Sequence, residues 1–357
     1  MVHTMIELVL LAVIAVADHV PNAMPAVVAS RYAKNFSAVA VQKSFPVPVP
    51  QAGEVLVEVL ASSINPIDWK VLDGALKDIF PLKFPQILGC DFVGRVVRAG
   101  ALPQGALSQG ALVWGDLGAG ASEGAYAAYV AVSASKVGLL APPGGALPAG
   151  FNATALATLP LVGKTMWQSL ELGRDNGVFA RARAARNGSV VLVTSGGGGT
   201  GTAGVQLAKA FGASHVITTG HGAEELALLR SLGADRVLDW ASEDVMADSV
   251  LANNSVDMII DNFGYGADAA VAKVRAGGVF VSLTHALPTK PKAGVSAFAT
   301  ICNASRHDDL DDMLRLVRTR ALRPVMQREV AAKDVTLGFR EGLDGGFSGK
   351  IGVTLDW

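Results

Sequence analysis

The residues from Gly196 to Gly201 carry the clearest chemical pattern in this chain. Gly196, Gly198 and Gly201 fit G-x-G-x-x-G, between the apolar run VVLVT and a helix-like segment that opens at the third glycine. In this setting the glycines permit a tight turn and a close approach of the backbone to a pyrophosphate. N–H groups at the start of the helix would bind the phosphates. The pattern therefore predicts a dinucleotide-binding site.

The end of the next predicted strand, HVITTG, bears on which dinucleotide binds. A site for NAD usually has an acidic residue here, which binds the 2′-hydroxyl of the adenosine ribose. This chain has Gly220 and then His221, and its nearest acids, Glu224 and Glu225, are expected on the following helix. Because no carboxylate is expected to repel a 2′-phosphate, the sequence favours NADPH. His221 either contacts that phosphate or is a solvated residue of the turn.

A second chemical candidate is Cys90 beside Asp91, in the stretch LGCDFVGRV. The pair could be half of a metal site, a reactive thiol with a helper, or two residues that pack there. A catalytic zinc needs about three protein ligands, and only Asp68 could join these two. A nucleophilic thiol needs a base or a cation beside it, but residues 24–155 contain no histidine. We therefore expect no metal and a packed or pocket-lining cysteine.

Two types of sequence surround these candidates. From Met24 to about Gly150, short valine-rich runs broken by Gly and Pro are typical of antiparallel strands in a barrel-like domain. From Thr154 onward, short apolar runs alternate with helix-like segments, which predicts a parallel sheet wrapped by helices. In the final segment GKIGVTL, apolar residues occupy every second position from Ile351 to Leu355, as in a strand, and we expect this segment to pair with the first domain. The dinucleotide domain is then an insertion into a discontinuous β domain.

The composition is that of a folded protein with more than one core. The chain has 357 residues, of which 50% are hydrophobic and 17% charged. Its formal net charge is −1 and it has no long basic run, so a nucleic-acid partner is not expected. Two cysteines without a C-x-x-C pair exclude a four-cysteine zinc lobe and fit a reducing compartment.

The N-terminus contains the apolar run IELVLLAVIAVA. This run is too short for the ~20 residues of a membrane-spanning helix, and no Lys or Arg precedes it as in a secretory signal. Residues 1–23 are left as an unassigned extension, which is either non-native or a targeting segment. We expect a cytoplasmic protein without a stable membrane span, with targeting left open by this extension.

In order, the segments from Met24 to Trp357 resemble the medium-chain dehydrogenase/reductase superfamily, in its zinc-independent quinone oxidoreductase branch. SINPIDWKVLDG resembles the branch's N-P-x-D-x-K-x-x-x-G segment, FPQILGCDFVGRVVRAG its P-x-x-x-G-x-D-x-x-G-x-V block, and SGKIGVTL its closing strand. The resemblance implies an α/β fold, with a Rossmann-type doubly wound parallel sheet domain (156–319) inserted into a discontinuous GroES-like β-barrel domain (24–155 and 320–357). It also implies a homodimer.

The resemblance also bears on the chemistry. Zinc-dependent relatives have a cysteine ligand in the segment matching SSINPIDWK and a His-Glu pair where this chain has Cys90 and Asp91. Without zinc, the nicotinamide carries the reaction and passes hydride to a quinone or to the C=C bond of an α,β-unsaturated carbonyl. A donor must then bind the carbonyl oxygen of the acceptor. Asn65 is the first candidate for this catalytic role, and Lys70 is the second.

Two other functions remain open from the sequence: a zinc-type alcohol dehydrogenase, and a cofactor-binding protein with a structural or interaction role. The predicted cofactor-binding residues are Gly196, Gly198, Gly199, Thr200, Gly201, Thr219, Gly220, His221, Asn262, Phe263, Phe280, Val281 and Lys350.

Overall fold

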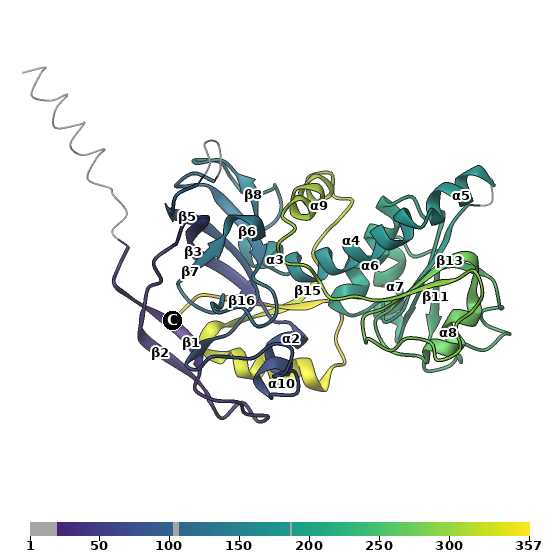
Figure 1. Ribbon diagram of the computed structural model, residues 1–357, viewed down its shortest axis with the longest axis horizontal. Helices are drawn as coiled ribbons and strands as arrows, with labels where there is room; N and C mark the ends of the chain where they lie inside the picture. Colours follow the sequence, from purple (N-terminus) through teal and green to yellow (C-terminus); the bar gives the residue numbers. More distant parts are fainter. Residues whose placement is uncertain (1–19, 103–106, 186–187) are drawn as a thin grey trace, which may run out of the picture.

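The structure is a computed structural model that describes residues 20–102, 107–185 and 188–357. Two lobes lie side by side along its longest axis (Figure 1). One lobe contains strands from both the first and the last part of the chain, and the other contains a parallel sheet with helices on its faces. The predicted α/β architecture, a parallel-sheet domain inserted into a discontinuous β domain, is confirmed.

The first lobe consists of two sheets. Its strands are β1 (Ala23–Ala29), β2 (Val39–Pro46), β3 (Glu54–Ser63), β4 (Gln86–Ile87), β5 (Asp91–Ala99), β6 (Leu112–Asp116), β7 (Tyr129–Ser133), β8 (Val137–Ala141), β15 (Met326–Ala331) and β16 (Lys350–Thr354). The strand orders are β2-β1-β4 and β15-β16-β3-β5-β6-β8, with β7 also paired to β3. The pairs among β1–β8 are antiparallel, as predicted for residues 24–150, and β16 pairs antiparallel with β3, whereas β15 and β16 pair in parallel.

Strand β3 packs into the core of the first lobe at one end and pairs with the last strand of the chain at the other. Val55, Val57 and Val59 alternate along the strand, and all three are buried in one apolar cluster. At its other end β3 pairs antiparallel with β16, with Gly352 opposite Ser63. The expected pairing of the last strand with the first lobe is therefore confirmed.

Short helices complete this lobe. They are α2 (Pro66–Leu72), η1 (Ala134–Lys136), α3 (Ala153–Ala157), η2 (Ala332–Asp334) and α10 (Val335–Asp344). α2 begins at Pro66, since the fixed φ of proline suits the first position of a helix. Its Trp69 packs against Phe339 of α10, with ring centroids 6.1 Å apart.

The second lobe is a six-stranded parallel sheet. Its strands are β9 (Val190–Val193), β10 (His215–Gly220), β11 (Arg236–Asp239), β12 (Val256–Asp261), β13 (Val274–Ser282) and β14 (Ser296–Ala299). The strand order is β11-β10-β9-β12-β13-β14, so the direction of winding reverses between β9 and β12. Ligands of such sheets bind at the carboxyl ends of the strands beside this reversal.

Helices cover both faces of the parallel sheet. They are α4 (Pro160–Asp175), α5 (Val178–Ala184), α6 (Gly199–Ala210), α7 (Ala223–Ser231) and α8 (Ala267–Lys273), whereas α9 (Asp308–Arg318) packs against α4 and β8. Val191 and Val193 of β9 pack in the cluster that contains α4 and α6, while Leu192 packs in the cluster that contains α8. Burial on both faces explains why this strand is apolar at every position.

The two lobes share one apolar core around α4. Trp114 of β6 and Leu140 of β8 belong to the same cluster as Met166 and Leu170 of α4. All four side chains are fully buried. The first helix of the second lobe is thus fixed to the barrel by packing.

Part of the N-terminal extension, residues 1–19, lies outside the described residues. Within the three described ranges, no helix combines the length and apolar character that a bilayer crossing requires.

Candidate functional site

The glycine loop joins β9 to α6 at the carboxyl edge of the parallel sheet. The N–H of Gly196 donates to the carbonyl oxygen of Thr219, and the N–H of Ser195 donates to its hydroxyl, both over 2.8 Å. α6 begins at Gly199, so the prediction that it opens at the third glycine was wrong. The turn already ends at Gly198, which is the extended N-cap residue of the helix.

Two glycines of this loop have different roles. A Cβ on Gly201 would lie 2.0 Å from the carbonyl oxygen of Ser195 and 2.6 Å from the Cα of Gly196, so only glycine lets α6 pack on the loop. A Cβ on Gly198 would meet nothing closer than 3.6 Å. The backbone at Gly198 is therefore open to a ligand, as a pyrophosphate site requires.

The C-terminal part of the chain closes the loop from another side. The N–H of Gly349 donates to the carbonyl oxygen of Gly197 over 2.7 Å. The stem of Lys350 lies against Gly199, where an added Cβ would be 2.6 Å from Lys350 Cδ. The start of β16 is therefore part of the predicted dinucleotide site.

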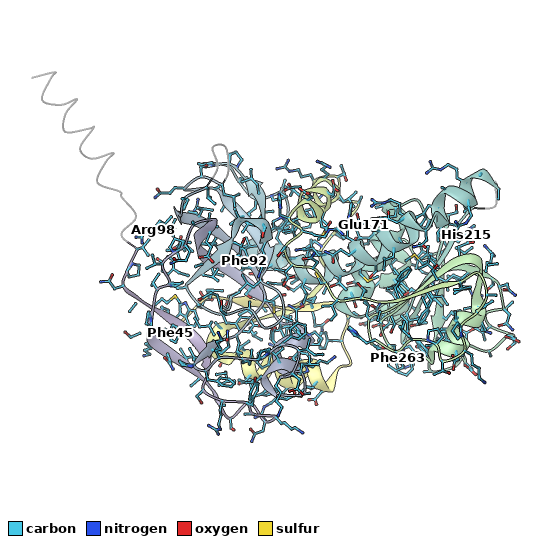
Figure 2. All side chains as sticks on the ribbon, in the orientation of Figure 1. Phe45, Phe92, Arg98, Glu171, His215 and Phe263 are labelled. Atoms are coloured by element: carbon cyan, nitrogen blue, oxygen red, sulfur yellow. The ribbon has the colours of Figure 1, made fainter. Side chains whose placement is uncertain are left out.

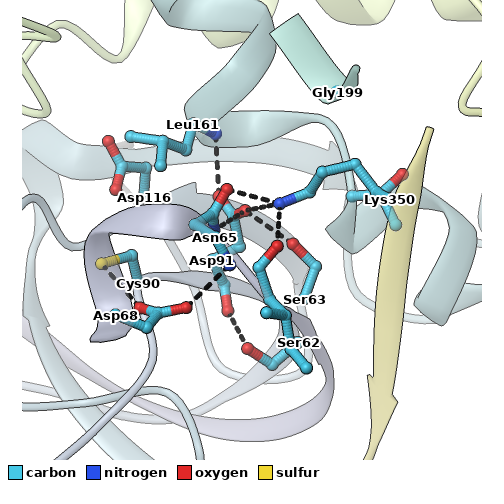
Figure 3. Close-up of polar contacts among 12 residues, drawn as sticks. Ser62, Ser63, Asn65, Asp68, Cys90, Asp91, Asp116, Leu161, Gly199 and Lys350 are labelled. Atoms are coloured by element: carbon cyan, nitrogen blue, oxygen red, sulfur yellow. Dashed lines mark hydrogen bonds and ion pairs between the residues drawn. The ribbon is translucent and has the colours of Figure 1, made fainter. Parts of the chain in front are cut away.

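A buried polar network centred on Asp91 lies at this junction (Figure 3). Its Oδ2 accepts hydrogen bonds from Ser63 Oγ and Asn65 Nδ2, and its Oδ1 accepts one from the backbone N–H of Leu161, each over 2.8 Å. Leu161 lies in the first turn of α4, and Leu159, the N-cap residue of that helix, makes no side-chain cap. The carboxylate of Asp91, on β5, caps α4 instead, and its negative charge stabilises the N-terminus of that helix.

Lys350 brings a positive charge into this network. Its Nζ donates to the carbonyl oxygen of Ile64 and to Asn65 Oδ1, and it lies 3.7 Å from Asp91 Oδ2. Burial lowers the pKa of Lys350, and the carboxylates of Asp91 and Asp68 oppose this shift. A buried ammonium is tolerated when it is paired and hydrogen-bonded, and these contacts meet both conditions.

A cleft of about 280 Å³ lies between α2 and the glycine loop. Trp69, Val162, Thr200, Phe347 and the stem of Lys350 are among the residues that line it. The cleft joins the backbone of the glycine loop to apolar and aromatic walls, a combination typical of small-molecule sites.

Comparisons with known proteins agree with the two lobes. Residues 51–142 match the alcohol dehydrogenase GroES-like domain, and residues 199–306 match a family described as zinc-binding dehydrogenase. The chloroplastic quinone-oxidoreductase homolog of Spinacia oleracea is 36% identical over 56% of this chain. The chloroplastic NADPH-dependent alkenal/one oxidoreductase of Arabidopsis thaliana is 32% identical over 75% of it. The quinone oxidoreductase structure from Coxiella burnetii is 25% identical, with a TM-score of 0.73 over 93% of this chain and 99% of that one.

The chain belongs to the medium-chain dehydrogenase/reductase superfamily, in its quinone oxidoreductase-like branch. Members of this superfamily bind a nicotinamide cofactor. The chain spans 56% and 64% of the lengths of the Spinacia and Arabidopsis relatives.

Zinc-type members of this superfamily place ligands where this chain has Cys90 and Asp91. Here Cys90 Sγ lies 3.4 Å from Asp68 Oδ1, and Asp68 Oδ2 accepts from the N–H of Asn65 and the hydroxyl of Tyr126, each over 2.8 Å. Burial, and then the charge of Asp68, raise the pKa of the Cys90 thiol, which disfavours the thiolate. Among residues 20–102, 107–185 and 188–357, no three His, Cys, Asp or Glu side chains are grouped as metal ligands.

The two predicted catalytic residues lie in different surroundings. Asn65 is fully buried, and its amide accepts from Lys350 and donates to Asp91. The structure therefore places Asn65 inside the network, where it positions Lys350.

Lys70 is exposed on α2, without a hydrogen bond or ion pair to any residue that the structure describes. Lys350, predicted to bind the cofactor, contacts the glycine loop through its stem while its ammonium faces the network.

Four further predicted cofactor residues lie on β13 or follow β12. The N–H of Asn262 donates to the hydroxyl of Thr194 over 2.8 Å, and Phe263 beside it is 63% exposed at the rim of the second lobe (Figure 2). Phe280 and Val281 are fully buried within β13 and are paired with β12 and β14. The structure does not bring these two residues to the carboxyl edge, because the strand continues to Ser282.

His221 lies at the carboxyl end of β10, at the adenosine end of the predicted site. It is exposed, its Nδ1 lies 2.8 Å from Asp239 Oδ1, and its ring centroid is 4.9 Å from that of Trp240. The imidazole therefore already has a carboxylate partner on β11.

The prediction of NADPH assumed that no carboxylate reaches this edge, and that premise was wrong. Glu225 on α7 accepts from the N–H of His221 over 3.0 Å and from the hydroxyl of Ser348 over 2.7 Å. A Cβ on Gly197 would lie 2.0 Å from Glu225 Oε2, so the carboxylate borders the glycine loop. The sequence correctly placed Glu225 on the helix after β10, but it did not show that the side chain reaches back to the end of that strand. The one sequence signal for this contact was the pair of acidic residues in the first turn of α7.

Substituting the two glycines separately tests the loop. G201A should lower the free energy of unfolding by about 3 kcal/mol, because backbone rather than flexible side-chain atoms must move. G198A should change it by less than about 1 kcal/mol, the scale of an N-cap effect, yet weaken dinucleotide binding by occupying the pyrophosphate approach. Urea unfolding and a dinucleotide titration measure both. A G201A protein as stable as the wild type would contradict this account.

Asp68 gives the stability a defined pH dependence. Burial raises its pKa from the ordinary 3.8 to about 6. The folded state then holds the proton more tightly than the unfolded state. The contribution of Asp68 to the free energy of unfolding is therefore fully present below pH 3.8 and is lost as the pH rises through about 6. D68N keeps a hydrogen-bond acceptor but does not titrate. The unfolding free energy of D68N minus that of the wild type should therefore increase by about 2 kcal/mol from pH 4 to pH 7. Denaturant unfolding at both pH values measures it, and a pH-independent difference would refute the assignment.

Proposed function

We propose that this chain is a reductase that transfers hydride from a reduced nicotinamide dinucleotide to a quinone or to the C=C bond of an α,β-unsaturated carbonyl, without a catalytic metal. The observation that carries the proposal is the cleft beside the glycine loop, whose walls include Trp69, Val162 and Phe347. An apolar cleft with aromatic walls suits a flat conjugated acceptor next to a dinucleotide.

The residues present fit the dinucleotide. The open backbone at Gly198 and the N–H groups at the start of α6 suit a pyrophosphate. When bound, the nicotinamide supplies the hydride. Lys350 lines the cleft, and its ammonium, held by Asn65 and Asp91, lies in the buried network beside it. This charge would stabilise the negative charge that develops on the carbonyl oxygen of the acceptor.

The hydrogen bonds at Cys90 and Asp91 support the metal-free part of the proposal. The Cys90 thiol contacts Asp68, and Asp91 already accepts three hydrogen bonds and pairs with Lys350. A zinc ion would need ligands that these partners occupy. In this respect the proposal departs from the zinc-binding description of the family that matches residues 199–306.

The names of the relatives support the class of acceptor. One relative is named for quinones and the other for alkenals and alkenones. Both kinds of acceptor offer an electron-poor carbon conjugated to a carbonyl group, and both require charge stabilisation at that oxygen.

The hydride donor can carry a 2′-phosphate or lack it. The sequence favours NADPH, and the NADPH-dependent Arabidopsis relative supports that choice. The Glu225 carboxylate opposes it, because a 2′-phosphate would bring further negative charge beside it. Hydride transfer is the same with either donor, since the two differ only at the adenosine ribose.

Location and assembly are part of the same proposal. The sequence favours a cytoplasmic protein, whereas two relatives named chloroplastic support a targeting role for residues 1–23. For the predicted homodimer, β14 ends the parallel sheet and offers an edge for pairing with a second copy.

An assay with two acceptors tests the proposed function. NADH and NADPH oxidation would be followed with a quinone and with a short enone, with and without a metal chelator. We expect reduction of at least one acceptor at a rate that the chelator does not change. Dinucleotide binding without turnover on either acceptor would contradict the reductase. Activity lost in chelator and restored by zinc would contradict the metal-free mechanism.

A further inference from the structure

We infer that Glu225 selects the dinucleotide at its adenosine end, accepting hydrogen bonds from the ribose hydroxyls of NADH and disfavouring the 2′-phosphate of NADPH. The inference rests on the proposed function, for which it specifies the hydride donor.

The position of the carboxylate is the first reason. Glu225 Oε2 would lie 2.0 Å from a Cβ on Gly197, and its Oε1 would lie 2.9 Å from a Cβ on Gly220. The carboxylate therefore lies between the glycine loop and the carboxyl end of β10. In doubly wound sheets the adenosine ribose binds there, usually to an acid at the strand end. Here the acid comes from the first turn of α7 instead.

The hydrogen bonds of the carboxylate are the second reason. One oxygen accepts from the N–H of His221 and the other from the hydroxyl of Ser348. A carboxylate has about four lone-pair sites, so about two remain for the 2′- and 3′-hydroxyls of a ribose. Because the two protein donors already fix the side chain of Glu225, binding the ribose need not order it.

The charge around the ribose position is the third reason. A pocket of about 420 Å³ adjoins Glu225. The described residues that line it include Glu224 and Glu225 but no lysine or arginine. The imidazole of His221 is bound to Asp239, and the N–H of His221 already donates to Glu225. A 2′-phosphate would meet the carboxylate of Glu225 without a fixed cation to pair with it.

Titrations of NADH and NADPH with the intact chain test this inference. The wild type should bind NADH at least about tenfold more tightly than NADPH, the effect of one hydrogen bond to a charged group. E225Q removes the charge but keeps the size, and it should shift the preference toward NADPH by at least about tenfold. E224Q is the matched control, because Glu224 is exposed next to Glu225 without its two hydrogen bonds, and it should shift the preference by less than about threefold.

Competition with AMP and with adenosine 2′,5′-bisphosphate separates this inference from the reductase proposal, since neither ligand takes part in hydride transfer. If the wild type binds AMP more tightly than adenosine 2′,5′-bisphosphate, the result supports the role of Glu225 even if no acceptor is reduced. The same comparison tests the inference if E225Q does not fold. Tighter binding of NADPH than NADH, or equal shifts in E225Q and E224Q, would overturn the inference, even if quinones or enones are reduced.

Discussion

The hydrogen bonds of the buried Asp91 carboxylate hold together the elements that form the site. They join the end of β3 to the first turn of α4, and the same carboxylate pairs with Lys350 at the start of β16. Lys350 in turn packs on the glycine loop, and Val162 of α4 lines the cleft. One charge therefore fixes the barrel, the first helix of the dinucleotide lobe and the C-terminal strand in a single arrangement.

The surroundings of Asp91 show that this arrangement is costly. Burial raises the pKa of both Asp68 and Asp116 to about 6 and lowers that of Lys350. Lys164, also fully buried, donates to the carbonyl oxygen of Ala304 over 2.5 Å. Buried charge clusters add little net stability, because desolvation offsets their attraction. We interpret the cluster as a means of holding Lys350 and α4 in position.

The fold could be predicted from local patterns, whereas much of the site could not. Strands buried on both faces read as continuous apolar runs, and the glycine loop has a fixed spacing, so the parallel sheet and its phosphate-binding turn follow from short segments. The contact of Lys350 with Asn65 joins residues 285 positions apart, which no local pattern encodes. Glu225 was missed for another reason: its helix was expected, but the direction of its side chain was not.

A double-mutant cycle on Asp91 and Lys350, followed by urea unfolding, tests most directly the claim that one charge organises the site. D91N should lower the free energy of unfolding by about 3–5 kcal/mol, because it leaves a buried ammonium without its partner. The double variant D91N/K350M should cost less than the sum of the single variants by more than about 1 kcal/mol. Additive effects, or a D91N protein as stable as the wild type, would contradict the account.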